Sequence, residues 1–205
     1  MIRNATMLAG LCSACLLLAS ALLWAQAPAP YPLPNLDLRT NGEIHALLLQ
    51  PDLSLVIAGR FSQVNGVERH NIARLQPAGQ LDPTWNPDIR GDGIHALARD
   101  DQGRIYAGGS FDQVGGQARR NLVRVAGSGS GAVDMAWSPQ PVGPVYALAV
   151  AAGGNAQVYA GGAFTEIGGI TRNYLARLSG SNGQADILWP AAGTDGAVHA
   201  LQFAP

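Results

Sequence analysis

The chain has 205 residues with 13 basic and 14 acidic side chains, which gives a formal net charge of −1. Every basic side chain is an arginine and none belongs to an extended run, so the composition argues against a nucleic-acid partner, whose phosphates need many neutralising contacts. Both cysteines, Cys12 and Cys15, lie in an apolar N-terminal stretch, which excludes disulfides, cysteine nucleophiles and cysteine metal sites from the rest of the chain.

Residues 1–27 have the pattern of a secretory signal peptide. A basic side chain precedes the apolar stretch from Met7 to Trp24, and Ala25-Gln26-Ala27 supplies the small residues of a cleavage site. Pro28 disfavours cleavage after Ala27, so a cut after Ala25 is an alternative. An uncleaved membrane anchor is another, because the stretch is at the lower edge of a transmembrane length. No later apolar run is long enough to span a bilayer. We expect an exported protein that is periplasmic, on the outer surface or extracellular.

The rest of the chain repeats one pattern at an interval of about fifty residues. The matching segments are Ile44-His45-Ala46-Leu47, Ile94-His95-Ala96-Leu97, Val145-Tyr146-Ala147-Leu148 and Val198-His199-Ala200-Leu201. A period of this length is typical of stacked supersecondary units such as propeller blades. The expected units are an N-terminal linker and partial repeat (28–40), repeat 1 (41–93), repeat 2 (94–144), repeat 3 (145–197) and the start of a truncated repeat 4 (198–205).

Repeat 1 contains the signals of four short strands and no helical period. In chain order these are Ile44–Leu49, Leu55–Phe61, Ile72–Leu75 and a short, irregular segment at Leu81–Trp85. Asn65-Gly66 predicts a tight hairpin, because both of its turn residues need positive φ. The sequence therefore predicts an all-β fold of propeller-type blades, each with four antiparallel strands. A β-solenoid fits so long a period less well, and a sandwich need not repeat in sequence.

The repeats share a set of spaced motifs. They are clearest in repeat 2, as Ala107-Gly108-Gly109-Ser110-Phe111, then Gly115-Gly116, then an Asn-led strand with Arg124-Val125. This combination resembles the delta-sixty repeat family of bacterial β-propellers, over about residues 36 to 205. Departures are Ala58 in place of the first glycine of the doublet, and Trp85, Trp137 and Trp189 where that family often has Phe. Kelch-like propellers, which also combine a Gly-Gly doublet with a later Trp, are a weaker alternative. The resemblance implies a secreted or envelope-exposed propeller and no particular chemistry.

About three full blades with partial ends predict an open arc or a fragment, because propellers close with at least about four blades. Leu36-Asp37 resembles the end of a repeat, and Val198 to Pro205 reproduces only a first strand. Pairing of these two ends into one blade is an alternative. An open arc exposes strand edges and apolar blade faces, so we expect self-association through the open edges.

One repeat position carries rings in every copy: His45, His95, Tyr146 and His199. The innermost strands of a propeller surround a channel, so these side chains are the candidates for binding a small ligand or a metal. The tyrosine in one copy, with no carboxylate at that position, favours packing over a metal site. We expect no metal and no cofactor.

Two further sets recur in every full repeat. Arg74, Arg124 and Arg177 recur with Asp82, Asp134 and Asp186, and the tryptophans are Trp85, Trp137 and Trp189. The arginines could hold anions, but recurrence in every copy favours Arg–Asp pairs within or between blades. The tryptophans could stack on sugars, but recurrence favours packing between neighbouring blades.

No catalytic motif occurs in the chain. Glu166 is specific to one copy, since Gln63 and Gln113 hold its position elsewhere, and a lone carboxylate near a turn is more typical of surface than of a general acid. The sequence therefore favours a non-catalytic, secreted or envelope-associated propeller with a structural or binding role, whose partner is a protein or glycan. The alternative is a fragment of a secreted propeller enzyme, such as a glycan hydrolase, with its catalytic residues outside this chain.

Overall fold

The computed structural model describes residues 38–153, 157–190 and 194–203. The expected signal peptide and most of the N-terminal linker lie outside these ranges. Throughout the described ranges the regular structure is strand and turn, and they contain no helix with the length and apolarity needed to cross a membrane.

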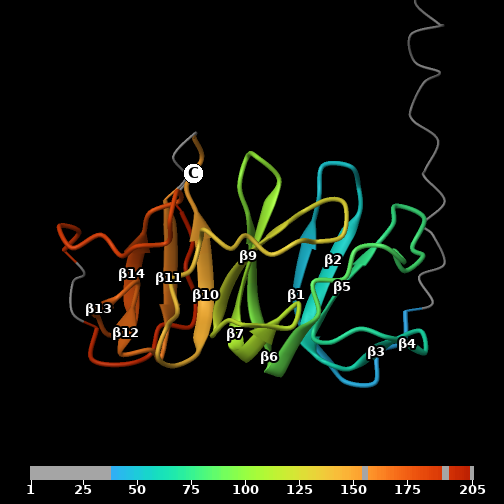
Figure 1. Ribbon diagram of the computed structural model, residues 1–205, viewed down its shortest axis with the longest axis horizontal. Helices are drawn as coiled ribbons and strands as arrows, with labels where there is room; N and C mark the ends of the chain where they lie inside the picture. The colour runs from blue at the N-terminus through green and yellow to red at the C-terminus, as the bar shows by residue number, and fades with distance from the viewer. Residues whose placement is uncertain (1–37, 154–156, 191–193, 204–205) are drawn as a thin grey trace, which may run out of the picture. The chain divides into compact units, whose positions relative to one another are not determined.

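Each full repeat forms one small antiparallel sheet (Figure 1). Blade 1 consists of β1 (Glu43–Leu49), β2 (Leu55–Arg60) and β5 (Ile72–Leu75), with the hairpin β3 (Gln63–Val64) and β4 (Val67–Glu68). Blade 2 consists of β6 (Ile89–Arg99), β7 (Arg104–Val114), β8 (Gln117–Ala118) and β9 (Leu122–Ala126). Blade 3 consists of β10 (Val145–Val150), β11 (Val158–Gly162) and β14 (Leu175–Leu178), with the hairpin β12 (Glu166–Ile167) and β13 (Ile170–Thr171). The all-β prediction of antiparallel blades is confirmed.

The fourth strand of each blade is reduced to one bridge, as its irregular sequence predicts. The bridges are Leu75↔Leu81, Val125↔Val133 and Leu178↔Ala185. The next residue, an aspartate in every copy, ends the strand. In blade 1 the Asp82 carboxylate accepts from the backbone N–H of Thr84 at 2.8 Å, and a side chain that bonds its own following backbone turns the chain out of the ladder.

The hairpins have the turn geometry that the sequence predicts. Asn65 and Gly66 have φ of 51° and 78°, and Gly115 and Gly116 have φ of 55° and 77°. Asparagine and glycine enter this left-handed region at little steric cost. The same turn is therefore built by different residues in different copies.

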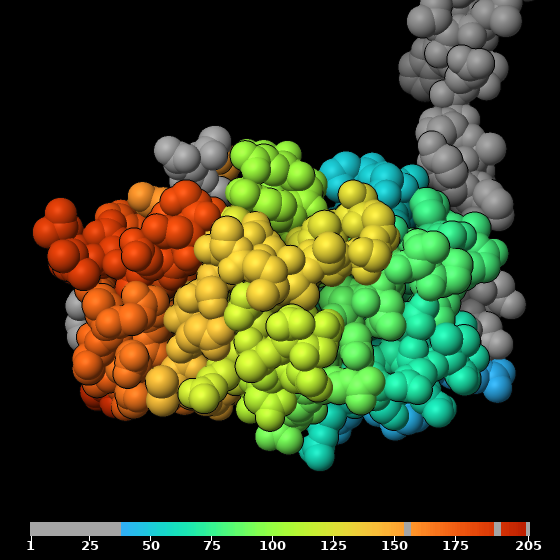
Figure 2. Space-filling model, in the orientation of Figure 1, coloured from blue at the N-terminus to red at the C-terminus, as the bar shows by residue number. Residues whose placement is uncertain are grey.

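The blades follow one another in chain order (Figures 1 and 2). Two hydrophobic cores lie between blades, and a third lies on the other face of blade 1, where Leu38 packs against residues such as Ile57. In the first core Val56 and Ala58 of blade 1 pack with Ile105 and Ala107 of blade 2. In the second core Tyr106 of blade 2 packs with residues of blade 3 such as Val158. The second strands are apolar on both faces because each face meets a core. In the part of the chain that the structure describes, the blades form an open row.

The glycine doublet of the second strand serves two contacts. A Cβ on Gly108 would lie 2.6 Å from Cγ1 of Val145, a side chain of the next blade. A Cβ on Gly109 would lie 2.2 Å from the carbonyl oxygen of Gly93, in the backbone of the adjacent strand. The first glycine therefore admits the next blade, and the second admits the neighbouring backbone.

We expect Gly109→Ala to lower the free energy of unfolding by about 2 kcal/mol, because backbone cannot move aside as a side chain can. Gly108→Ala is the matched control and is expected to cost less than half as much, since Ala58 already holds that position in blade 1. Urea denaturation at neutral pH measures both. Equal losses would contradict this assignment of the two contacts.

A left-handed residue precedes the third strand in every blade. It is Asn71 (φ 61°), Asn121 (φ 59°) and Tyr174 (φ 66°). The carboxamide oxygens of Asn71 and Asn121 accept from the backbone N–H of Phe61 and Phe111 at 3.2 and 3.1 Å. A tyrosine has neither this acceptor nor a low cost in the left-handed region.

Tyr174→Asn is therefore expected to stabilise the protein by about 1 kcal/mol, because asparagine adopts this backbone conformation more readily and carries the missing acceptor. The shift in the urea midpoint provides the measurement. Tyr174→Ala serves as the control and should give no gain; a gain of equal size would point to removal of the ring as the cause.

Candidate functional site

The innermost strand of each blade carries a bulge at the ring position. The pairing register shifts between Ile44 and Ala46, between Ile94 and Ala96, and between Val145 and Ala147. The residues inside these shifts are His45, His95 and Tyr146. A bulge leaves one residue outside the ladder and redirects its side chain. Each blade therefore presents one ring from the same place on its first strand.

The four rings predicted as ligand candidates lie in a continuous row, here called the ring ladder. His45 stacks on His95 with centroids 5.3 Å apart, and His95 meets Tyr146 edge-on at 5.3 Å. Tyr146 stacks on His199 at 4.8 Å with planes only 6° apart. Each ring therefore contacts the next ring of the row, and the role of these residues in ligand binding stays a prediction.

The ladder is polar as well as aromatic. His45 Nδ1 lies 3.1 Å from the Ile94 carbonyl oxygen, and Nε2 lies 3.1 Å from the Glu43 carboxylate. Both partners are hydrogen-bond acceptors. Burial, and then the neighbouring His45, lower the pKa of His95 below its ordinary value. The described residues contain no group of three or more metal-ligating side chains, so the ladder offers rings and single polar atoms to a ligand.

His95→Tyr tests how the ladder titrates. The folded-state pKa of His95 is depressed, so its contribution to stability is present above the unfolded pKa of about 6.5 and is lost as pH falls below it. Tyrosine does not titrate here and already holds this position in blade 3 as Tyr146. The fall in Tm between about pH 7.5 and pH 5.5 should therefore be smaller in the variant. An unchanged fall would assign the acid sensitivity to other groups.

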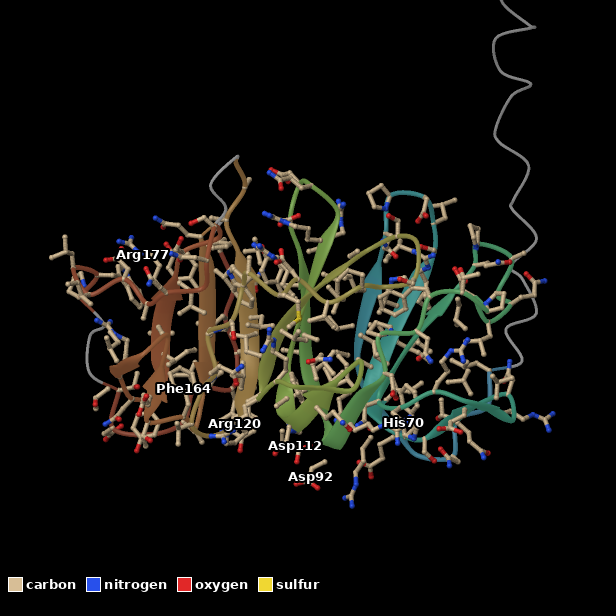
Figure 3. All side chains as sticks on the ribbon, viewed as in Figure 1. His70, Asp92, Asp112, Arg120, Phe164 and Arg177 are labelled. Carbon is tan, nitrogen blue, oxygen red and sulfur yellow. The ribbon has the colours of Figure 1, made fainter. Side chains whose placement is uncertain are left out.

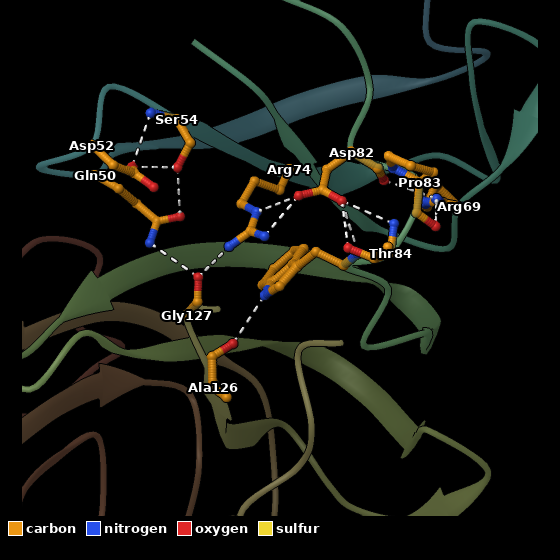
Figure 4. A network of polar contacts seen from close by, with 11 residues as sticks. Gln50, Asp52, Ser54, Arg69, Arg74, Asp82, Pro83, Thr84, Ala126 and Gly127 are labelled. Carbon is orange, nitrogen blue, oxygen red and sulfur yellow. Dashed lines mark hydrogen bonds and ion pairs between the residues drawn. The ribbon is translucent and has the colours of Figure 1, made fainter. Parts of the chain in front are cut away.

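The recurring arginine, aspartate and tryptophan form a contact between blades, here called the clamp (Figure 4). Arg74 donates to the Asp82 carboxylate from Nε at 3.0 Å and from Nη2 at 2.7 Å. Its Nη1 donates to the carbonyl oxygen of Gly127 in blade 2. Trp85 Nε1 donates to the neighbouring carbonyl of Ala126 at 2.9 Å. Blade 1 thus holds two successive carbonyls of the following turn.

The second clamp repeats the first between blades 2 and 3. Arg124 donates to Asp134, and its Nη1 reaches the carbonyl of Gly180. Trp137 Nε1 donates to the Ser179 carbonyl at 2.9 Å, and the Arg124 guanidinium lies 5.4 Å from the Trp137 ring. These contacts show Arg–Asp–Trp units that join blades, which is the structural role that recurrence favoured.

The clamps also lower the pKa values of their aspartate side chains. Burial alone would raise the pKa of Asp82, but hydrogen bonds from Arg74 and Thr84 outweigh it and hold the pKa well below the ordinary value. The balance is the same at Asp134, where burial is outweighed by Arg124 and the pKa is lowered. These carboxylates are therefore ionised partners of the clamp at neutral pH.

Copy-specific polar side chains gather at the other end of the blades. Figure 3 shows His70, Asp92, Asp112 and Arg120 at the end opposite Arg177. Two hollows open there. The first, about 440 Å³, lies between blades 1 and 2 and is lined by residues that include Arg60, His70 and Arg90. The second, about 310 Å³, is lined by residues that include Asp92, Asp112 and Arg120.

We call this surface the polar end. Its residues do not recur: Ser62, Asp112 and Thr165 share one repeat position, and His70, Arg120 and Asn173 share another. Glu166, the copy-specific acid singled out in the sequence, is exposed on the short strand β12. Sequence reasoning missed the polar end, because the first hollow is lined by residues of two blades and the second by β6, β7 and the segment before β9, which are far apart in the sequence. Comparison of the copies position by position was the signal that could have found it.

Antiparallel blades joined by repeated inter-blade contacts define a β-propeller repeat protein. A family model described as a domain of unknown function (DUF5122) beta-propeller matches residues 50–84, 103–131 and 157–186, one segment in each blade. These matches in all three repeats are consistent with the delta-sixty type of bacterial β-propeller repeat that the motifs predict. No curated protein and no solved structure shows significant similarity to the chain.

Proposed function

We propose that the chain is an exported, non-catalytic β-propeller that binds a glycan at the polar end. One observation carries this proposal: the side chains that recur in every copy are engaged between blades, whereas those that differ between copies gather around two hollows. Recurring residues serve the repeat, and only copy-specific residues can select one ligand.

The chemistry of the hollows supports a polar ligand of limited size. Arg60, Arg120 and Asp112 offer charged donors and acceptors, and volumes of about 440 and 310 Å³ are in the range of small-ligand sites. Hydroxyl groups of sugars pair with such side chains. A protein ligand is the other partner class, and capture from an envelope extract, run beside the glycan array, detects it.

Binding of the purified chain to an array of envelope and extracellular glycans tests the proposal. Arg60→Ala and Asp112→Ala are each expected to weaken binding at least tenfold without a change in Tm. Gln102→Ala, an exposed polar change at the turn between β6 and β7, is the matched control and should bind normally. Binding that none of these changes affects would exclude the polar end. Capture of an envelope protein but no glycan would favour the protein ligand.

A second candidate function, an enzyme with its own carboxylates and not the fragment considered from the sequence, rests on one observation, that Asp92 and Asp112 line the same hollow. Glycoside hydrolysis usually needs two carboxylates. Release of reducing ends from a bound glycan, abolished in Asp112→Asn, would contradict the non-catalytic proposal.

N-terminal sequencing of the secreted product tests export. The mature chain is expected to begin at Gln26 or Pro28.

A further inference from the structure

The clamp has a donor half on one blade and an acceptor half on the next. The donor half is an arginine Nη1 with a tryptophan Nε1. The acceptor half is a pair of successive turn carbonyls, Ala126 with Gly127 in blade 2 and Ser179 with Gly180 in blade 3. The donor half pairs with the acceptor half twice in the chain, between blades 1 and 2 and between blades 2 and 3. An unpaired donor half therefore indicates a binding surface for an acceptor half, and the reverse.

Blade 3 carries a third donor half. Arg177 donates to Asp186 at 3.0 Å from Nε and lies 5.8 Å from the Trp189 ring. Within residues 38–153, 157–190 and 194–203, no carbonyl of a later turn accepts from Arg177 or Trp189. Trp189 is partly exposed, whereas Trp85 and Trp137 are 0% exposed. This donor half is assembled and open.

Blade 1 carries the matching acceptor half. Gln76 and Pro77 hold the positions of Ala126 and Gly127, and both are exposed. The Gln76 N–H donates to the Gln80 carbonyl at 2.8 Å, as the Ala126 N–H donates to Ala132 at 2.9 Å, so the two turns close in the same way. The carbonyls of blade 1 are therefore placed like those that the clamps already hold.

The first strand of blade 1 is also uncovered, although the second and third strands on the same face are buried and Leu38 packs against them. Ile44 is 38% exposed, whereas its counterparts Ile94 and Val145 are 0% exposed. Leu47 is 63% exposed, while Leu148 at the same repeat position reaches the space above Gly108 of the preceding blade. These apolar side chains lie where they would pack against a preceding blade.

We propose that blade 1 of a second copy docks on blade 3, so that Arg177 and Trp189 bind the carbonyls of Gln76 and Pro77. The second copy is the occupant because its exposed face continues an interface that already forms twice inside the chain. The contact is heterologous, so copies add head to tail and either close a ring or extend. This inference is independent of the proposed glycan site.

Residues 198–203 hold part of the docking surface in the single chain. Val198 fills the space above Gly161 that Val145 fills above Gly108, and its N–H donates to the Gly162 carbonyl at 3.2 Å. No strand among the described residues pairs with this segment. It is a copy in register of β1, so β1 of the second copy takes its place by strand exchange.

Sedimentation velocity over a concentration series tests the docking. Wild type is expected to form species larger than a monomer. Leu47→Glu on blade 1 and Arg177→Ala on blade 3 should each weaken association at least tenfold. Leu53→Glu is the matched control, because Leu53 is equally apolar and 59% exposed in the turn after β1, and it should associate normally.

A mixture of the two variants gives the sharpest result. Each retains the face that the other lacks, so Leu47→Glu and Arg177→Ala together should form a heterodimer and nothing larger, which misfolded chains would not do. Removing residues 198–205 should strengthen association. A monomeric wild type, variants that associate like wild type, a mixture without heterodimer, or weaker association after the removal would each overturn the proposal.

Discussion

Arg124→Ala is expected to lower the free energy of unfolding by about 3 kcal/mol. The Arg124 side chain is only 4% exposed, and its loss leaves the Asp134 carboxylate and the Gly180 carbonyl without this donor. The loss of stability arises mainly from the buried guanidinium, its packing against Trp137 and its bond to Gly180, because the Asp134 side chain is 32% exposed and keeps its hydrogen bond from the Ala136 N–H. Urea denaturation at pH 7, followed by tryptophan fluorescence, measures the loss.

Two further variants separate the causes. Arg124→Lys keeps the charge but not the planar fork, so it should recover only a minor part of the stability. Arg90→Ala removes an arginine whose side chain is 47% exposed and paired at the surface, and should cost less than about 1 kcal/mol. A stable Arg124→Ala protein that no longer binds its ligand would reassign this arginine from the scaffold to a binding site.

Trp137→Ala is expected to cost about 4 kcal/mol. The Trp137 side chain is 0% exposed, packs edge-on against Tyr106 with centroids 5.1 Å apart, and donates to Ser179 of the next blade. The change leaves a cavity at the centre of the second core and removes half of the clamp. The expected result is a lower urea midpoint and a broadened thermal transition.

The repeat supplies its own controls for this change. Trp137→Phe keeps most of the packing and loses the indole N–H, so it should cost about 1 to 2 kcal/mol. Trp189→Ala should cost clearly less than Trp137→Ala at low protein concentration, because Trp189 is partly exposed in the single chain. Equal losses at the two positions would mean that burial between blades is not the source of the stabilisation.

The blade itself could be predicted because its signals are local and recur. Three such signals are the Asn65-Gly66 turn, the glycine doublet and the apolar second strand. Each reflects one steric or packing requirement, which the other repeats meet with related residues. The irregular fourth strand was predictable in blade 1, since Pro83 after Asp82 removes a backbone donor at the strand end.

Contacts between blades were less accessible to sequence reasoning. Recurrence of Arg124 with Asp134 indicated a pair, but left open whether it lies within or between blades. The structure shows both: the carboxylate belongs to the same blade, and the carbonyl of Gly180 belongs to the next. Every residue has a backbone carbonyl, so the sequence does not show which one accepts the hydrogen bond.

The ring position shows the same limit. Recurrence selected His45 and its counterparts, yet the stacking between blades depends on the bulge that turns each ring out of its ladder. A bulge changes the register of backbone pairing and has no residue signature here. The polar end was hidden differently, because its hollows combine side chains that are far apart in the sequence, from two blades in the first hollow and from separate segments of blade 2 in the second.

On the blade that accepts the hydrogen bonds, the clamp donates only to main-chain carbonyl groups. Because the receiving turns contribute only main-chain oxygens to the clamp, the residue before the glycine differs between blades, as Ala126 and Ser179 show. Modules of this kind can be duplicated, lost or reordered by recombination, and each new neighbour meets the same attachment point. We therefore expect the number of blades to vary between related proteins more readily than the Arg–Asp–Trp contact that joins them.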